Sequence, residues 1–405
     1  MKKILFLLSL ACVLYSSCQK ENEVNNNQKV SIKAIVEPAQ TKADINSSYQ
    51  TIWRENDEIS VYLSTWTNNK YQPFILDEGK DTKEATFTWN GDPTWTWKWT
   101  DAKYAFYPKA SASNQYINQD NGTFHYNLPT SYDYTSEQSV LPLAAYLGNV
   151  DNPTIEFKYL CGAVKISLKD VPAKANSIEL SLGNNVLTGW HYVPAAGIGG
   201  DNPVGLIKYD DNTSTTPVKF NFAQASDKRD MVFLFPVPPT STAAKVKIDL
   251  YHDTAKIWSV ESNKAQSAIA RKDVLAMPQL TVAPYTKTIT VGIISYLTDP
   301  SDGKLNAANF KIHYWGGYDG TVDKSLTSLG TQESKQVGYW DGNPSHTFNL
   351  YSVEVPSDIT GFKIWYDVPD SSSDYWFGSD GSSSHSKVYV FDYGEGDDRH
   401  RAQYE

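Results

Sequence analysis

The sequence predicts an all-β protein built from β-sandwich domains. Short runs of alternating apolar and polar residues recur along the chain, and Gly, Pro, Asn and Asp bound them, which is typical of sandwich strands and their turns. No segment keeps apolar residues at i, i+3 and i+4 with helix caps for three turns, so helices are not expected. The 405 residues allow about two to four domains.

Breaks at 148–153 and 283–285 divide the chain behind its leader into three blocks of sandwich size. The predicted domains are a signal peptide with its tether and three β-sandwiches: 1–27, 28–152, 153–284 and 285–405. The first block has candidate strands at 30–36, 58–64, 84–89, 102–108 and 122–128. Those of the second are 154–160, 163–169, 177–183, 217–223, 231–237, 245–251, 256–262 and 274–280. The third has 287–294, 310–315, 346–355, 361–367 and 387–393.

The first residues predict an exported lipoprotein. A basic start, an apolar stretch at 4–13 and small residues lead to Cys18. This order resembles a bacterial lipobox, which implies that Cys18 carries lipid; an ordinary secretory signal is the alternative. No other apolar run approaches the roughly 20 residues that span a bilayer, so we expect attachment by lipid alone. Residues 19–28 predict a solvated tether, whose acidic start resembles the tag that exports lipoproteins to the outer face of the outer membrane.

Charge and cysteine content narrow the possible partners and chemistries. The net charge of -10 argues against nucleic acid. Of the three cysteines, Cys12 leaves with the signal and Cys18 takes lipid, so Cys161 has no disulfide partner and is expected to be buried in a strand. The seven histidines show no metal-binding spacing, and no nucleophile motif or phosphate loop occurs. Loop carboxylates such as Asp397 are expected to be solvated, and we predict no catalytic residue, metal or cofactor. Calcium at the loop 299–303 is the open alternative, although this loop lacks the spaced ligand series and the Glu of a specific calcium site.

Four stretches of the first two blocks carry a family resemblance: 41–64, 103–108, 159–168 and 270–282. In this order they resemble the fimbrillin family of Bacteroidetes, over roughly residues 28–284. The resemblance implies two transthyretin-like β-sandwiches in tandem, in a surface adhesin or pilus component. With the last block, the predicted fold is two transthyretin-like β-sandwiches followed by a third β-sandwich domain.

Two departures from the family pattern favour an anchor, a tip or a solitary adhesin over a repeating stalk subunit. The resemblance implies that a trypsin-like protease, often Arg-specific, removes the leader of stalk subunits and frees a groove for a donor strand. The first arginine here is Arg54, where cleavage would damage the sandwich, although Lys29, Lys33 and Lys42 would serve another protease. A whole third domain also follows the second sandwich.

The segment FKIHYWGGY at 310–318 is the richest candidate for recognition. The two-residue period of a strand puts the even-numbered residues from Phe310 to Tyr314 on one face and the odd-numbered residues from Lys311 to Trp315 on the other. Indole, imidazole and ammonium groups side by side suit a sugar ring, which stacks on indole through its C–H face and hydrogen-bonds through its hydroxyls. The alternative is that Trp315 only caps the sandwich edge.

Three stretches of the last block, 310–317, 338–367 and 374–381, resemble the starch-binding carbohydrate-binding modules of bacterial amylases, while the insert at 325–337 and the acidic tail do not obviously belong. By position, the resemblance implies a hydrogen-bonding histidine at 313 and indole platforms at 315 and 376. The predicted glycan-binding residues are His313, Trp315, Trp340, Asp374, Tyr375 and Trp376. Asp380 is a further candidate for binding hydroxyls, and the side on which Trp365 lies stays open.

A tryptophan run in the first block has two interpretations. Period two places Trp95, Trp97 and Trp99 on one face, where they would form either a sugar-binding ladder or part of a core. We expect core or inter-domain packing, because an exposed row of indoles would be a sticky patch.

Together these features predict a non-catalytic, lipid-anchored adhesin of the outer membrane that presents a glycan-binding third sandwich. The expected partners are a polysaccharide or host glycan, with an α-glucan as one candidate, and other fimbrillin subunits. One alternative is a fimbrial anchor or tip whose last domain contacts proteins. Another is a glycoside hydrolase, which would need two carboxylates that converge on an aromatic cleft.

Overall fold

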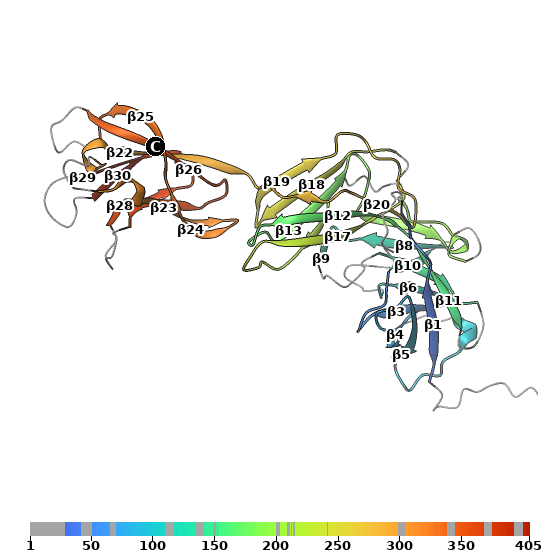
Figure 1. Cartoon of the computed structure of the whole chain (residues 1–405). Helices are drawn as coiled ribbons and strands as arrows, with labels where there is room; N and C mark the ends of the chain where they lie inside the picture. The colour runs from blue at the N-terminus through green and yellow to red at the C-terminus, as the bar shows by residue number, and fades with distance from the viewer. Residues whose placement is uncertain are drawn as a thin grey trace, which may run out of the picture. The chain divides into compact units, whose positions relative to one another are not determined.

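The computed structural model describes residues 29–41, 51–64, 70–109, 117–120, 122–134, 141–148, 151, 153–199, 203–208, 211, 213, 215–240, 242–298, 305–337, 345–367, 375–392 and 400–405. Within these ranges the chain is all-β, as predicted, and its only helices are short 3₁₀ turns (Figure 1). None of these helices is long and apolar enough to cross a membrane. The chain forms two compact units, which we describe separately. The division at residues 152 and 284 stays a prediction.

The first unit comprises the described residues of 1–37, 51–110 and 144–158. Its strands close into a barrel in the order β1, β11, β10, β6, β3, β4, β5. In chain order they are β1 (Ser31–Val36), β3 (Glu58–Leu63), β4 (Tyr71–Glu78), β5 (Glu84–Trp89), β6 (Ala102–Tyr107), β10 (Leu143–Tyr146) and β11 (Thr154–Tyr159). β1 pairs in parallel with β11 and antiparallel with β5. Because this path is a closed barrel, the expected transthyretin-like sandwich is not confirmed here.

The barrel is filled by aromatic side chains around Trp53, which is completely buried. The centroid of its ring lies 4.9 Å from that of Phe87, 5.2 Å from that of Tyr107 and 5.5 Å from that of Phe157, each in an edge-on arrangement. The indole Nε1 donates a hydrogen bond to the carbonyl oxygen of Lys83 at 3.2 Å. The Trp53 indole is therefore satisfied at its polar edge and packed on its apolar surface.

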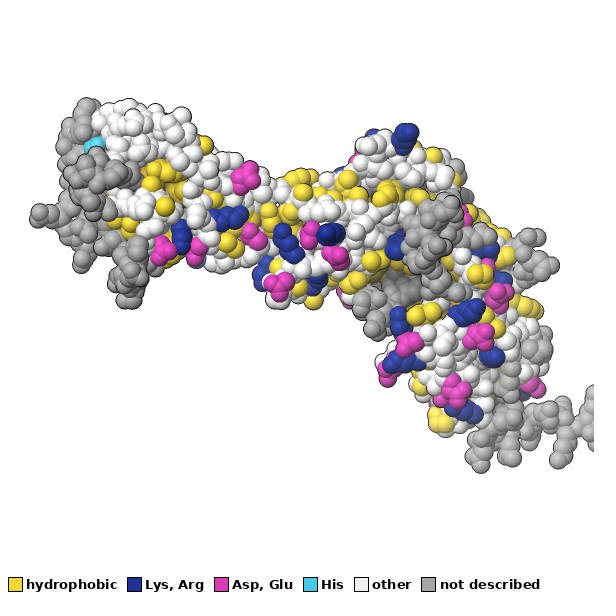
Figure 2. Space-filling model, in the orientation of Figure 1, with side chains coloured by type: hydrophobic (Ala, Val, Ile, Leu, Met, Phe, Trp, Pro, Cys, Tyr) yellow, Lys and Arg dark blue, Asp and Glu magenta, His cyan; other side chains and the backbone are white. Residues whose placement is uncertain are grey.

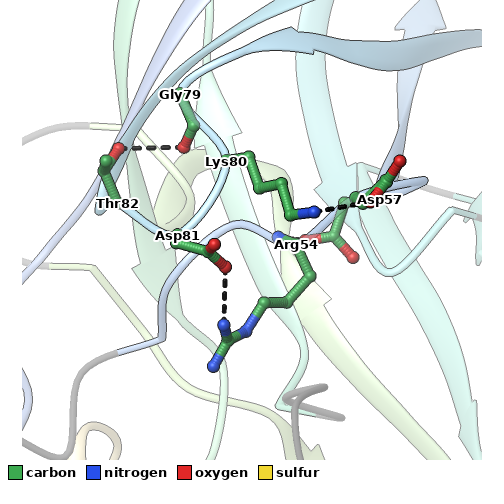
Figure 3. Close-up of polar contacts among 7 residues, drawn as sticks. Arg54, Asp57, Gly79, Lys80, Asp81 and Thr82 are labelled. Atoms are coloured by element: carbon green, nitrogen blue, oxygen red, sulfur yellow. Dashed lines mark hydrogen bonds and ion pairs between the residues drawn. The ribbon is translucent and has the colours of Figure 1, made fainter.

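Two turns that flank this core are tied together by polar contacts (Figure 3). Asp57 is buried, and its two carboxylate oxygens accept from the backbone N–H of Arg54 at 2.7 Å and the hydroxyl of Tyr107 at 3.0 Å. Burial raises the pKa of the Asp57 carboxyl, and these hydrogen bonds oppose that effect. The Arg54 guanidinium reaches across to Asp81, with 2.6 Å between Nη1 and Oδ1. Arg54 is thus held within the folded barrel.

The tryptophan run 95–99 contributes to this unit without forming a strand. Trp97 and Trp99 are buried, as the core interpretation predicts, and Trp95 is half-buried. The Trp97 ring packs edge-on against Phe74 at 5.1 Å between centroids and against Trp99 at 5.3 Å. The 3₁₀ helix η1 (Trp99–Asp101) then leads into β6.

The second unit comprises the described residues of 38–50, 111–143 and 159–405. Its first part contains sheets of order β17, β12, β20, β2 (with β21 on β12) and β19, β18, β13, β16, β9, and a further sheet of order β15, β14, β8, β7. The strands are β2 (Gln40–Thr41), β7 (Ile117–Asp120), β8 (Thr123–Leu128), β9 (Ser131–Asp133), β12 (Gly162–Val171), β13 (Ser177–Leu182), β14 (Gly189–Pro194), β15 (Ile207–Lys208), β16 (Val218–Asn221), β17 (Arg229–Val237), β18 (Val246–His252), β19 (Ala255–Glu261), β20 (Asp273–Ala276) and β21 (Leu280–Thr281). The first two sheets share one hydrophobic core. Cys161 is buried, as predicted, but it lies in the bend between β11 and β12 and not in a strand. Burial raises the pKa of its thiol.

The rest of the second unit consists of two sheets that enclose a second core, with orders β25, β26, β22, β29, β30 and β24, β23, β27, β28. Their strands are β22 (Thr286–Ile294), β23 (Phe310–Gly317), β24 (Gly320–Ser325), β25 (Thr327–Lys335), β26 (His346–Pro356), β27 (Gly361–Tyr366), β28 (Tyr375–Ser382), β29 (Lys387–Asp392) and β30 (His400–Tyr404). The insert at 325–337, which did not fit the family pattern, forms part of this sheet, because β25 pairs antiparallel with β26. The end of the acidic tail is also part of the sheet, since β30 pairs with β29.

Candidate functional site

The candidate site lies on the outer face of the sheet formed by β24, β23, β27 and β28. On β23 the side chains of Phe310, Ile312 and Tyr314 are completely buried, whereas the alternate residues from Lys311 to Trp315 are half-buried and point to the other side. The predicted division of this strand into a core face and an outer face is therefore confirmed. The outward residues meet neighbours from β24, β27 and β28.

Four ring side chains gather on this outer face, and we call them the aromatic face: His313, Trp315, Trp365 and Trp376. The His313 ring lies 6.0 Å from the Trp315 ring and 5.5 Å from the Trp376 ring between centroids, edge-on to the latter at 87°. Trp376 and Trp365 are stacked, with 5.5 Å between centroids and 18° between planes. Trp376 keeps 42% of its surface exposed, so this face presents indole to solvent.

A carboxylate on β24 connects two members of the aromatic face. Oδ1 of Asp323 lies 2.8 Å from Nδ1 of His313 and 3.1 Å from Nε1 of Trp365. His313 and Asp323 are direct neighbours across β23 and β24. Because an ionised carboxylate only accepts hydrogen bonds, Nδ1 of His313 carries the hydrogen, and in the neutral ring Nε2 is then an acceptor.

Two lysines flank the stacked indoles. The ammonium of Lys311 lies 5.2 Å from the centroid of Trp365, and that of Lys363 lies 5.5 Å from the centroid of Trp376, both within the range of a cation–π interaction. Each cation also has a carboxylate nearby. Lys311 Nζ is 2.5 Å from an oxygen of Asp367, and Lys363 Nζ is 3.8 Å from Oδ1 of Asp380. The positive charges of the two lysines are therefore offset by neighbouring carboxylates.

Figure 2 shows basic and acidic side chains interspersed over the side of the molecule in view.

The position of Trp315 depends on a glycine. A Cβ built on Gly361 would lie 2.6 Å from Cζ2 of the Trp315 indole and 2.9 Å from the carbonyl oxygen of Gly381, so the indole lies directly over the backbone of β27. The two residues are neighbours in the β23–β27 register. Only a residue without a side chain leaves room for an indole there.

The structure brings together three of the six predicted glycan-binding residues, namely His313, Trp315 and Trp376. Trp340 and Asp374 lie outside the described residues, as does Cys18, the predicted lipidation site. Tyr375 opens β28, where only its backbone is described. The further candidate Asp380 has an exposed side chain next to Lys363.

Trp365 and Asp323 belong to the site but were not selected from the sequence. Trp365 lies between Ile364 and Tyr366, and all three are apolar or aromatic, so alternation alone did not give its side. The partner strand decides the side on which Trp365 lies. Ile364 is the neighbour of Ile312 across β23 and β27, and both are buried, so Trp365 lies on the outer face. Asp323 had no local signal, because its role arises only from the pairing of β24 with β23.

The chemistry available on the aromatic face is stacking on the indoles and hydrogen bonding, with the Asp323 carboxylate as an acceptor and the Lys311 and Lys363 ammonium groups as donors. Within the described ranges no group of three or more metal-ligating side chains is close enough to hold an ion. A separate polar hollow of about 520 Å³ lies on the other sheet of this part of the unit. It is lined by Ser328, Gly330, Thr331, Gln332, Asn349, Leu350 and Tyr351, where an irregularity interrupts the pairing of β25 with β26.

No family model matches the chain, and no curated protein matches it. Similar solved structures include a candidate cell-adhesion protein from Bacteroides ovatus ATCC 8483, with 11% identity over 60% of this chain and 88% of that one and a TM-score of 0.35. A fimbrial protein from the same organism has 11% identity over 75% of this chain but only 58% of that one, with a TM-score of 0.29. The fimbrial anchor protein Mfa2 from Porphyromonas gingivalis has 11% identity over 57% of this chain and 82% of that one, with a TM-score of 0.24. TM-scores this low establish neither a shared fold nor a shared function.

Proposed function

We propose that this protein is a non-catalytic cell-surface adhesin that binds a glycan on its aromatic face. The observation that supports this proposal is the meeting of His313 and Trp315 on β23 with Trp376 on β28, although they are far apart in the sequence. Their rings point away from the core, and Trp376 is substantially exposed. A cluster of aromatic side chains at the surface with polar groups around it is typical of a recognition site.

The chemistry of the face suits a sugar better than an apolar partner. Indole faces stack on the C–H side of a pyranose, while acceptors such as Nε2 of His313 take hydroxyl donors. The lysines are offset by Asp367 and Asp380, so the face does not depend on an anionic ligand. An α-glucan is the first class to test. Stacking platforms of this kind hold extended chains weakly, which suits attachment through many copies on a cell.

The rest of the proposed organisation serves to display this face. Lipid on Cys18 would hold the protein on the outer membrane, the following residues would act as a tether, and the units before the third block would be fimbrillin-like. A polysaccharide or host glycan would be the ligand, and other fimbrillin subunits are further proposed partners.

The test is affinity electrophoresis of the full-length chain, solubilised in detergent, through gels that contain soluble starch, glycogen or other polysaccharides. We expect Trp315→Ala and Trp376→Ala to weaken retention by about tenfold or more. Trp190→Ala is the matched control, since Trp190 is 41% exposed on β14 and lies outside the aromatic face. Unchanged mobility of both site variants would reject the assignment. Absence of retention on every gel, together with co-purification of other fimbrial subunits, would favour an anchor or tip whose last domain contacts proteins.

A further inference from the structure

Asp323 contacts two rings of the aromatic face at once. Its Oδ1 accepts from His313 on β23 and from Trp365 on β27, so a single oxygen spans three strands. Its other oxygen, Oδ2, has no hydrogen-bond partner among the described residues, and 46% of the side chain is exposed. The carboxylate therefore holds protein atoms with one oxygen and leaves the second available.

The two donors are the rings that contact Trp376. Trp365 stacks on it, and His313 meets it edge-on. An imidazole on a surface strand can turn about its last side-chain torsion and exchange its hydrogen between its nitrogens. A charged acceptor at 2.8 Å from Nδ1 restricts both the rotation of the ring and the exchange of its hydrogen. The indole of Trp365 is restricted in the same way through Nε1.

We propose that Asp323 is the positioning residue of the aromatic face and that Trp365 is one of the rings that bind the ligand. This inference rests on the proposed glycan-binding function. Asp323 fixes the Nδ1–H form of His313, so Nε2 is an acceptor for the ligand, and it holds Trp365 in the stack with Trp376. Oδ2 supplies a second acceptor beside the first. Both ligand-facing atoms therefore accept hydrogen bonds, which matches the hydroxyl donors of a sugar.

The positioning role can be measured without any ligand. Two indoles whose ring centroids are 5.5 Å apart couple excitonically, and the coupling gives a paired band in circular dichroism when their in-plane transition dipoles are rotated relative to each other. Trp365→Phe and Trp376→Phe in the full-length chain define the size of that band. We expect Asp323→Leu to lose most of it, because neither ring then has its acceptor. Asp323→Asn keeps an acceptor oxygen at the same place and should retain most of it. Glu261→Gln, which removes an ion-paired carboxylate 50% exposed on β19, is the control and should change nothing.

Retention on the polysaccharide gel provides the second measurement. We expect Asp323→Leu and Trp365→Phe to weaken retention by about tenfold, and Asp323→Asn to restore part of it. A wild-type chain that is retained, with Asp323→Leu retained equally and showing an unchanged band, overturns the positioning role and leaves the proposed function standing. A wild-type chain retained on no polysaccharide overturns the proposed function, while the dichroism of Asp323→Leu still decides the positioning role. If Asp323→Leu does not fold, Asp323→Ala, which also removes the acceptor, takes its place in both measurements.

Discussion

Trp365 and Trp376 are direct neighbours across β27 and β28, and their indoles stack with 18° between their planes. The residues beside them in the sequence, Ile364 and Phe377, are also neighbours across the two strands and are completely buried. The pleat of the sheet thus sends one pair into the core and the other to the surface. A cross-strand stack at the surface has no core-packing role, which is why we assign it to recognition.

Gly361→Ala is expected to displace Trp315 from the aromatic face. The new methyl group would lie 2.6 Å from Cζ2 of the indole, closer than atoms in contact approach. Glycan retention should fall about as far as in Trp315→Ala, measured by the same electrophoresis. A double-mutant cycle with Trp315→Ala provides the control: once the indole is absent, the methyl group should cost retention nothing further. Equal losses from Gly361→Ala with and without Trp315 would contradict this account of the glycine.

Cleavage at Arg54 is expected to be blocked in the folded protein. Its backbone N–H bonds to Asp57, and its guanidinium is paired with Asp81. An Arg-specific protease needs an extended segment in its active site, and exposing one here would break open the barrel around the buried Trp53. Limited proteolysis followed by mass spectrometry should find no native cut after Arg54.

Lys29 and Lys33 form a matched comparison for a Lys-specific protease. The Lys29 side chain is 59% exposed and precedes β1, whereas Lys33 lies within β1 between β5 and β11. We expect cutting after Lys29 to precede cutting after Lys33. Rapid native cleavage after Arg54 would instead support processing of the kind expected for stalk subunits.

The stability of the second unit is expected to fall in mild acid because of His191. This side chain is completely buried on β14, where Nδ1 lies 2.9 Å from the carbonyl oxygen of Gly189 and Nε2 has no hydrogen-bond partner among the described residues. Burial lowers the pKa of His191, so the folded chain keeps the neutral ring where the unfolded chain, with a pKa near 6.5, takes up a proton. The free energy of unfolding is therefore greatest above about pH 6.5. It falls by up to about 1.4 kcal/mol per pH unit below that, until the folded chain also binds the proton.

Urea unfolding of the wild type and of His191→Leu at about pH 7.5 and about pH 5.5 measures how much His191 contributes to the pH dependence of the free energy of unfolding. The variant should lose less stability between the two pH values than the wild type, whatever its stability at the higher pH. Trp190→Ala, which changes an exposed residue of the same strand that carries no titratable group, should keep the wild-type difference. Equal losses in the wild type and in His191→Leu would show that another group titrates.

Much of the fold follows from local alternation, and the remainder depends on partners that a single segment does not reveal. The alternation on β23 gave the correct division between the inward and outward residues, because Phe310 and Ile312 are each followed by a basic side chain, which sets the phase for the rest of the strand. β25 has no such pattern. Its residues are nearly all exposed, and the strand forms only because β26 offers a free edge. The site divides in the same way, since Trp315 and Trp376 were chosen from their own sequence context whereas Asp323 depends on register.

Because β1 pairs in parallel with β11, the first unit cannot be cut out as one continuous segment of the chain. The chain leaves this unit, supplies β7, β8 and β9 to the other, and then returns to close the barrel with β10 and β11. A fusion protein cut at residue 152 would lack β11 and expose the edges of β1 and β10, which invites association with other chains. During synthesis the barrel cannot close until the chain has been made through Tyr159, so contacts distant in sequence set the pace of its folding.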